Sequence, residues 1–103
     1  SMAENFASRR CDPVQVLEQA LERAGQVAGV FISMTAERAR AEAEAAAARW
    51  RAGCPLSPFD GVPVAWKDLF DVAGTITTAG ADYRRKAPAA LRDASCVARL
   101  SSL

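Results

Sequence analysis

Between residues 13 and 24, apolar positions repeat at the spacing of an amphipathic helix. Asp12 is a good N-cap for this helix, and Pro13 fits the first helical position, where a missing N–H leaves no hydrogen bond unmade. Gly25 is a natural stop. The apolar face consists of Val14, Leu17, Leu21 and Ala24. The pattern therefore predicts a helix that packs one stripe on a core.

A second segment, from about residue 35 to Ala52, has the composition of a helix but few large apolar side chains. Ala, Glu and Arg dominate it, all of them strong helix formers, and Gly53 follows as a stop. Its small face can approach another helix closely but buries little area. We predict a helix stabilised mainly by intrinsic propensity, with Arg40 and Glu44 as an i,i+4 ion pair.

The segment Val62–Trp66 is apolar at every position. Such a run, without alternation, is typical of a strand that is buried on both faces in an α/β protein. Pro63 cannot donate to a ladder, so it is expected at the start of the strand or on an edge. The run Val30–Ile32 is β-branched and aromatic, and it predicts either a brief strand or an extended connector.

The rest of the chain alternates between loop and helix. Residues 72–81 are rich in Gly and Thr and predict a loop, and residues 83–88 predict a basic turn. Asp93 or Ser95 can open a last helix with Val97 facing inward. The chain as a whole is thus predicted to be α-rich, with about three helices and one or two short strands.

The composition excludes several classes of function. A net charge of +1 gives no electrostatic case for binding nucleic acid or a membrane surface, and no apolar stretch reaches the roughly 20 residues of a membrane span. Histidine is absent, and Cys11, Cys54 and Cys96 are too widely spaced for a disulfide framework or a zinc site. We therefore predict no metal, no cofactor, and reduced thiols in a cytoplasmic protein.

The two ends of the sequence are predicted to differ in order. Ser1 and Met2 look like the scar of a cleaved tag, and residues 3–11 show no periodicity, so 1–11 are expected to be a scar and a flexible lead-in. Residues 12–103 are long enough for one domain at most. The last helix has no stop signal, so we expect 12–103 to be the N-terminal part of a longer domain.

Lys67 is the residue to which chemistry is most readily assigned. It stands at the end of the most apolar segment, and only Lys86 accompanies it in a chain with 11 arginines. A buried lysine can lose its proton, whereas an arginine cannot. The plain alternative is an exposed lysine, which is the usual situation. Asp68 and Asp71 follow at a spacing that favours turn-stabilising roles over a pair of catalytic carboxylates, and Asp68 can support the orientation of Lys67.

Three short motifs follow one another in order. They are Gly61–Asp68, with Gly61, Pro63, Lys67 and Asp68 at the characteristic positions, then Asp71–Gly74, and then Thr77–Gly80. With the Ala-rich helix that precedes it, this series resembles the amidase signature family. The resemblance implies an α/β fold, with a mixed sheet flanked by helices, that hydrolyses carboxamide C–N bonds through a Ser–cisSer–Lys triad. It makes Lys67 the desolvated, unprotonated catalytic lysine, and it makes Gly61, Pro63 and Asp68 supporting residues of the motif.

Both serines of the family's triad lie in a Gly/Ser-rich segment that this sequence does not contain. The resemblance therefore implies an N-terminal portion of an amidase that contributes only the lysine and is inactive alone. The substrate of the complete enzyme would be a small-molecule amide, whose binding residues the sequence does not identify, and no cofactor is implied.

Two alternatives stay open. One is a homologue of the tRNA-linked amidotransferase, although Asp71–Gly74 is closer to the stand-alone small-amide enzymes. The other is a non-enzymatic interaction fragment that covers its unpaired strand by forming a homodimer.

Overall fold

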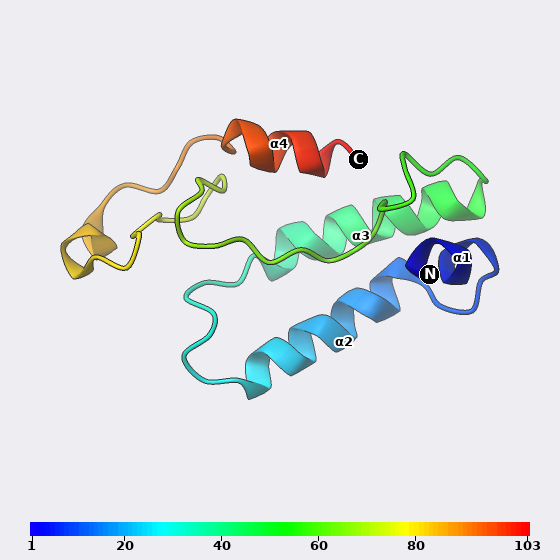
Figure 1. Cartoon of the computed structure of the whole chain (residues 1–103), viewed down its shortest axis with the longest axis horizontal. Coiled ribbons are helices and arrows are strands. Elements are labelled where there is room, and N and C mark those ends of the chain that lie inside the picture. Colours follow the sequence, from blue (N-terminus) through cyan, green and yellow to red (C-terminus); the bar gives the residue numbers. More distant parts are fainter. The chain divides into compact units, whose positions relative to one another are not determined.

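The computed structural model describes all 103 residues and contains four α-helices and one short 3₁₀ helix (Figure 1). The α-helices are α1 (Met2–Ala7), α2 (Pro13–Gln26), α3 (Ala36–Arg51) and α4 (Ser95–Ser101), and the 3₁₀ helix η1 is Asp82–Lys86. The chain divides into two compact units, Ser1–Val64 and Ala65–Leu103. No helix is both long enough and apolar enough to cross a membrane.

The first unit is built on α2 and α3, which lie side by side (Figure 1). The carboxylate of Asp12 accepts a hydrogen bond from the Val14 N–H at 2.8 Å, which confirms the predicted N-cap of α2. Leu17 is buried on one helix, and on the other the small residues Ala43, Ala46 and Ala47 are buried. The small alanine face therefore lets the two helices approach closely, as predicted. Pro13, at the start of α2, is also fully buried.

The charges on α3 pair differently from the prediction. Arg40 does not pair along its own helix with Glu44; its guanidinium donates to both carboxylate oxygens of Glu18 on α2, at 2.6 and 3.0 Å. The i,i+4 pair on α3 is instead formed by Arg38 and Glu42, at 2.8 Å. A bidentate pair between two helices has better geometry than one along a single exposed helix, because both oxygens of the carboxylate are used.

A helix lies where the sequence predicted a flexible lead-in. Ser1 caps α1 in a capping box with Glu4, in which the Ser1 side chain accepts from the Glu4 N–H and the Glu4 side chain accepts from the chain start. Phe6 is 3% exposed, and its ring lies 5.8 Å from that of Trp50 on α3. The helix is too short to show a period in the sequence, and it is stabilised by burying one aromatic side chain.

The predicted strands do not form, and the structure contains none. Val62–Trp66 has no regular secondary structure, and Val64 in its middle is 54% exposed rather than buried on both faces. Val30–Ile32 belongs to the exposed connector between α2 and α3. A strand needs a second segment to complete its hydrogen bonds, and that requirement cannot be read from a local apolar pattern.

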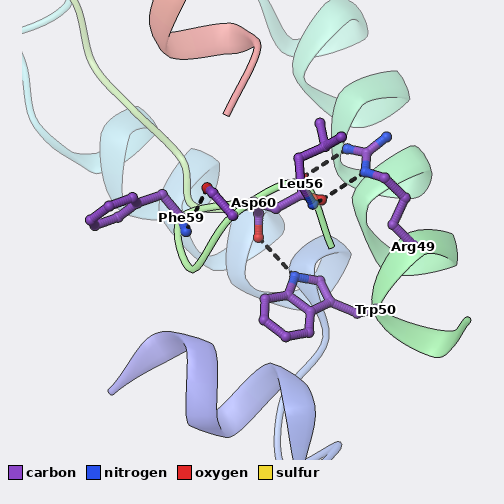
Figure 2. A network of polar contacts seen from close by, with 6 residues as sticks. Arg49, Trp50, Leu56, Phe59 and Asp60 are labelled. Carbon is purple, nitrogen blue, oxygen red and sulfur yellow. Dashed lines mark hydrogen bonds and ion pairs between the residues drawn. The ribbon is translucent and has the colours of Figure 1, made fainter. Parts of the chain in front are cut away.

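The residue before Gly61, Asp60, has a buried carboxylate that is held by several hydrogen bonds (Figure 2). Asp60 is 4% exposed, and its two oxygens accept from the Arg49 guanidinium, each at 2.7 Å. The Leu56 N–H donates to the same carboxylate at 3.0 Å, and the Trp50 indole N–H donates to the backbone carbonyl of Asp60 at 2.9 Å. These contacts lower the pKa of Asp60, chiefly because the guanidinium donates to the ionised carboxylate.

Gly61 passes so close to α2 and α3 that a side chain would not fit. Its φ is +85°, and a Cβ there would lie 2.9 Å from Pro13 Cβ and Cγ and 3.1 Å from Ala46 Cβ. The Pro13 ring is fully buried and rigid, so it cannot move aside cheaply. Glycine is therefore required at the first position of the 61–68 motif for both its backbone conformation and its small size.

The second unit consists of loops, the short helix η1 and, near its C-terminal end, α4. Val97 on α4 is fully buried, and the last turn of the preceding loop is held by a hydrogen bond from the Ala94 N–H to the Asp71 carbonyl, at 2.8 Å. The Gly74 N–H donates to the Ala90 carbonyl at 2.9 Å, and the Ala90 N–H donates to the Thr75 carbonyl at 2.8 Å. The chain therefore folds back on itself without a regular strand.

Replacing Gly61 by Ala is expected to destabilise the chain by about 2–4 kcal/mol, the combined effect of a left-handed conformation and of overpacking. Gly53→Ala is the matched control: Gly53 has φ +72°, but nothing lies within 4 Å of its added Cβ, so only the conformational cost of about 1–2 kcal/mol applies. Urea unfolding followed by circular dichroism measures both. Equal losses for the two variants would contradict the close approach.

Replacing Asp60 by Asn is expected to cost about 2–4 kcal/mol, between the values for exposed and fully buried ion pairs, because Arg49 is 30% exposed. Asp82→Asn, which breaks the exposed Arg85–Asp82 pair, is the control and should change the free energy of unfolding by less than about 1 kcal/mol.

The same carboxylate predicts a pH dependence. The folded-state pKa of Asp60 is below its ordinary value of 3.8, so its contribution is complete above that pH and is lost as the pH falls below it. Urea midpoints between pH 7 and 3 should show this acid-side loss in the parent chain. An Asp60→Asn variant with the same loss would show that another group is responsible.

Candidate functional site

Lys67 lies at the start of a tight turn in the second unit. The Lys67 carbonyl accepts from the N–H of Leu69 at 2.7 Å and from that of Phe70 at 3.3 Å. The Lys67 side chain is exposed, and neither a hydrogen bond nor an ion pair holds its ammonium. The expectation of a desolvated lysine at the end of a buried strand is therefore not met within these residues, because the strand that was to bury it does not form.

Aromatic side chains flank this turn. The rings of Trp66 and Phe70 meet edge to face, with centroids 5.7 Å apart and planes at 71°. This is a favourable geometry for an aromatic pair, and it joins the residue before Lys67 to the residue that closes the turn. Leu69 and Phe70 are 55% and 40% exposed, so two apolar side chains are accessible within three residues of Lys67.

Asp68 fixes the turn to a residue ten positions further along the chain. Its carboxylate accepts from the Thr78 backbone N–H at 2.9 Å and also from the Thr78 hydroxyl, and Thr78 is 8% exposed. The Thr78 hydroxyl has the largest effect on the pKa of Asp68, and with the backbone amides of Thr78, Gly80 and Ala79 it lowers that pKa below 3.8. Asp68 is therefore an ionised acceptor and not a proton donor at neutral pH.

The backbone after Thr78 is bent to surround this carboxylate. Ala79 has φ +51° and Gly80 has φ +77°, and Gly80 donates to the Thr78 hydroxyl at 3.3 Å. These are the two central residues of a type I′ turn, which a hydrogen bond from the Ala81 N–H to the Thr78 carbonyl closes at 2.9 Å. The left-handed conformation costs a non-glycine residue such as Ala79 roughly 1–2 kcal/mol. The hydrogen bond that closes the turn and the two hydrogen bonds from Thr78 to Asp68 offset that cost.

Two further aspartates join the neighbouring motifs to the same loop. Asp71 accepts from the Thr77 hydroxyl at 2.6 Å, and Asp93, just before α4, accepts from the Ala73 N–H at 2.8 Å. The end of the first motif and the two motifs that follow it are thus parts of one hydrogen-bonded loop. Sequence reasoning placed Asp68 and Asp71 in turn-stabilising roles, but it missed Thr78 and Asp93, whose partners are ten and twenty positions away.

The predicted supporting residues fall on both sides of the division between the units. Gly61 and Pro63 belong to the first unit, whereas Lys67 and Asp68 belong to the second. An apolar hollow of about 420 Å³ lies in the first unit, lined by Ala3, Glu4, Ala7, Trp50, Pro55, Ser57 and Pro58, and none of the predicted site residues lines it. No group of three or more His, Cys, Asp or Glu side chains could hold a metal ion.

Comparison with known proteins gives consistent relatives. The Amidase family model matches residues 14–103. The chain is 42% identical to AtzE, a 1-carboxybiuret hydrolase subunit of Pseudomonas sp. (strain ADP), over 96% of this chain. Over 84% of this chain it is 44% identical to the putative amidase AmiB2 of Mycobacterium tuberculosis. Over 77% of this chain it is 32% identical to a mitochondrial glutamyl-tRNA(Gln) amidotransferase component of Ixodes scapularis.

A solved structure agrees with these sequences. It belongs to a vestigial protein complex described as revealing the evolutionary origins of an s-triazine catabolic enzyme, and it superposes with a TM-score of 0.89 at 41% identity, covering 98% of this chain. The chain spans about a fifth of the length of these relatives: 22% of the hydrolase subunit, 18% of the putative amidase and 23% of the solved chain. With a family model that matches most of its residues and a helix arrangement shared at this identity, the chain belongs to the amidase family.

Proposed function

We propose that this chain is the part of an amidase that supplies the catalytic lysine, Lys67, for the hydrolysis of carboxamide C–N bonds. One observation supports the assignment above all: Lys67 lies on a turn that Thr78 of the third motif anchors through Asp68, in a chain that belongs to the amidase family. The fold that we propose for the complete enzyme is α/β, with a mixed sheet flanked by helices.

In the proposed mechanism, unprotonated Lys67 takes a proton from a bridging serine, which in turn activates a second serine as the nucleophile. Neither of these serines has a counterpart in the motifs present here, so the 103 residues contribute only the base and are inactive alone. Desolvation of Lys67 requires further polypeptide over it, because its side chain is exposed within this chain.

Hydrolysis of a small amide is favoured over amide transfer on tRNA. The similarity to a hydrolase subunit extends over 96% of the chain, whereas the similarity to the Ixodes scapularis amidotransferase component extends over 77%. A net charge of +1 also provides little attraction for a nucleic acid. The three cysteines are free, which is consistent with the cytoplasmic location that we propose.

A second candidate function, self-association without catalysis, is supported by exposed apolar side chains between α2 and α3. Val30 and Ile32 are 60% and 71% exposed, and Phe31 is 42% exposed. Clustered apolar groups of this kind commonly mark surfaces that bind another protein. The two functions are compatible, because this segment contains none of the residues of the Lys67 turn.

The proposed role of Lys67 can be tested in a chimera in which this chain replaces the aligned region of the Pseudomonas hydrolase subunit. The chimera is expected to hydrolyse an amide substrate of that enzyme, and Lys67→Met should lower kcat/KM by roughly 10⁴-fold, as for loss of a triad member. Lys67→Arg should be equally inactive, because an arginine keeps its proton.

Lys86→Met is the matched control, since Lys86 is an exposed lysine on η1, and it should leave the rate unchanged. The purified 103-residue chain is expected to release no ammonia from the same substrates. Full activity of the Lys67→Met chimera, or Lys67-dependent hydrolysis by the isolated chain, would contradict the proposal.

Self-association predicts a dimer in solution that depends on the exposed segment. Light scattering of the purified chain at micromolar concentration should give twice the mass of 10.9 kDa, and Ile32→Glu should return it to the monomer by placing a charge in the contact. Leu91→Glu is the control, because Leu91 is 99% exposed outside that segment. A monomer at all concentrations would rule out this second function.

A further inference from the structure

We propose that Asp68 and Thr78 act together as positioning residues for Lys67, which sets the direction in which its side chain leaves the turn. The inference rests on the proposed function of Lys67 as the base. Neither residue would touch the substrate: Asp68 is occupied by Thr78, and Thr78 is 8% exposed.

The covalent geometry makes Asp68 the effective anchor. Its Cα is one peptide bond from that of Lys67, so fixing the Asp68 side chain restricts the backbone dihedrals on which the lysine direction depends. The carbonyl of Lys67 is fixed at the same time, because Leu69 and Phe70 donate to it at 2.7 and 3.3 Å. The carbonyl side of Lys67 is therefore held, while its side chain is exposed.

The anchor is itself held against movement. Thr78 offers a hydroxyl and an N–H to the same carboxylate, a two-point attachment that fixes orientation as well as distance. The Arg84 guanidinium donates to the Thr77 carbonyl at 3.1 Å, and the Thr77 hydroxyl donates to the Asp71 carboxylate at 2.6 Å. Thr77, the residue before Thr78, is therefore held through both its backbone and its side chain.

The turn after Thr78 places a residue other than glycine at a position with a positive φ. Ala79 keeps a left-handed φ of +51°, although a glycine would adopt it without strain. Strained backbone of this kind persists where the surrounding contacts hold it in place, and it is concentrated at functional sites. Here the turn is closed by a hydrogen bond from the Ala81 N–H to the Thr78 carbonyl at 2.9 Å, and its first residue, Thr78, is held by Asp68, the neighbour of the proposed base.

The first test uses the chain itself and needs no activity. Thr78→Val removes the hydroxyl while keeping the shape, and by NMR the amides of Leu69 and Phe70 should then exchange about 10-fold faster or more. Thr78→Ser should restore the slow exchange. Thr75→Val is the matched control, because the Thr75 hydroxyl donates locally to the Val72 carbonyl at 2.8 Å and should leave both amides unchanged.

The second test separates positioning from general loop stability in the chimera described above. Asp68→Asn and Thr78→Val should lower kcat about 10²-fold with KM within about twofold, as expected when a base is misplaced but the substrate still binds. Thr78→Ser should recover most of the rate.

The outcomes distinguish the two proposals. If Lys67→Met abolishes hydrolysis while Asp68→Asn and Thr78→Val leave kcat unchanged, Lys67 is the base and the positioning role is wrong. If Lys67→Met stays active, the proposed function itself fails. Should either substitution prevent the chimera from folding, the exchange experiment decides, and unchanged exchange at Leu69 and Phe70 in Thr78→Val would overturn the positioning role.

Discussion

An ionised carboxylate needs hydrogen-bond donors, and both ends of the 61–68 motif depend on this constraint. Asp60 immediately precedes Gly61, and Asp68 is the last residue of the same segment. Each takes its donors from about ten residues away, Asp60 from Arg49 and Asp68 from Thr78. A carboxylate removed from water is tolerated only where such donors replace the lost hydration. The two aspartates therefore fix where the segment begins and where it ends.

The two anchors achieve this in different ways. At Asp60 the donor is the charged guanidinium of Arg49 on helix α3. Gly61, the next residue, lies so close to Pro13 and Ala46 that its backbone has little room to move. At Asp68 the donors are neutral groups on a strained turn, so the backbone conformation provides the complement to the charge. Between them Val64 is exposed, which indicates that this segment is held through its ends and not through burial of its middle.

The exposure of Lys67 in this chain is compatible with the role of catalytic base that we propose for it. A base has to be pointed in a defined direction before a substrate or a partner group reaches it, and the hydrogen bonds of the Lys67 turn supply that direction locally. Lowering the polarity around the base is a separate requirement, which the apolar side chains Leu69 and Phe70 meet only in part. Relatives of about five times this length have much more polypeptide with which to complete it.

The sequence alone determined the features that depend on near neighbours. Helix α2 with its Asp12 cap, the alanine-rich α3 and the ordered series of three motifs all follow from residues within a few positions of each other, and the motif series led to the correct family. Tertiary structure decided the rest. Val62–Trp66 has the composition of a strand but no partner strand, and Lys67 is exposed because that strand does not form. Helix α1 is too short to show a helical period in the sequence. Thr78 and Asp93 matter only because folding brings them to groups ten and twenty positions away. Local propensity is set by the residue itself, whereas burial and hydrogen-bond partnership are set by what the rest of the chain places beside it.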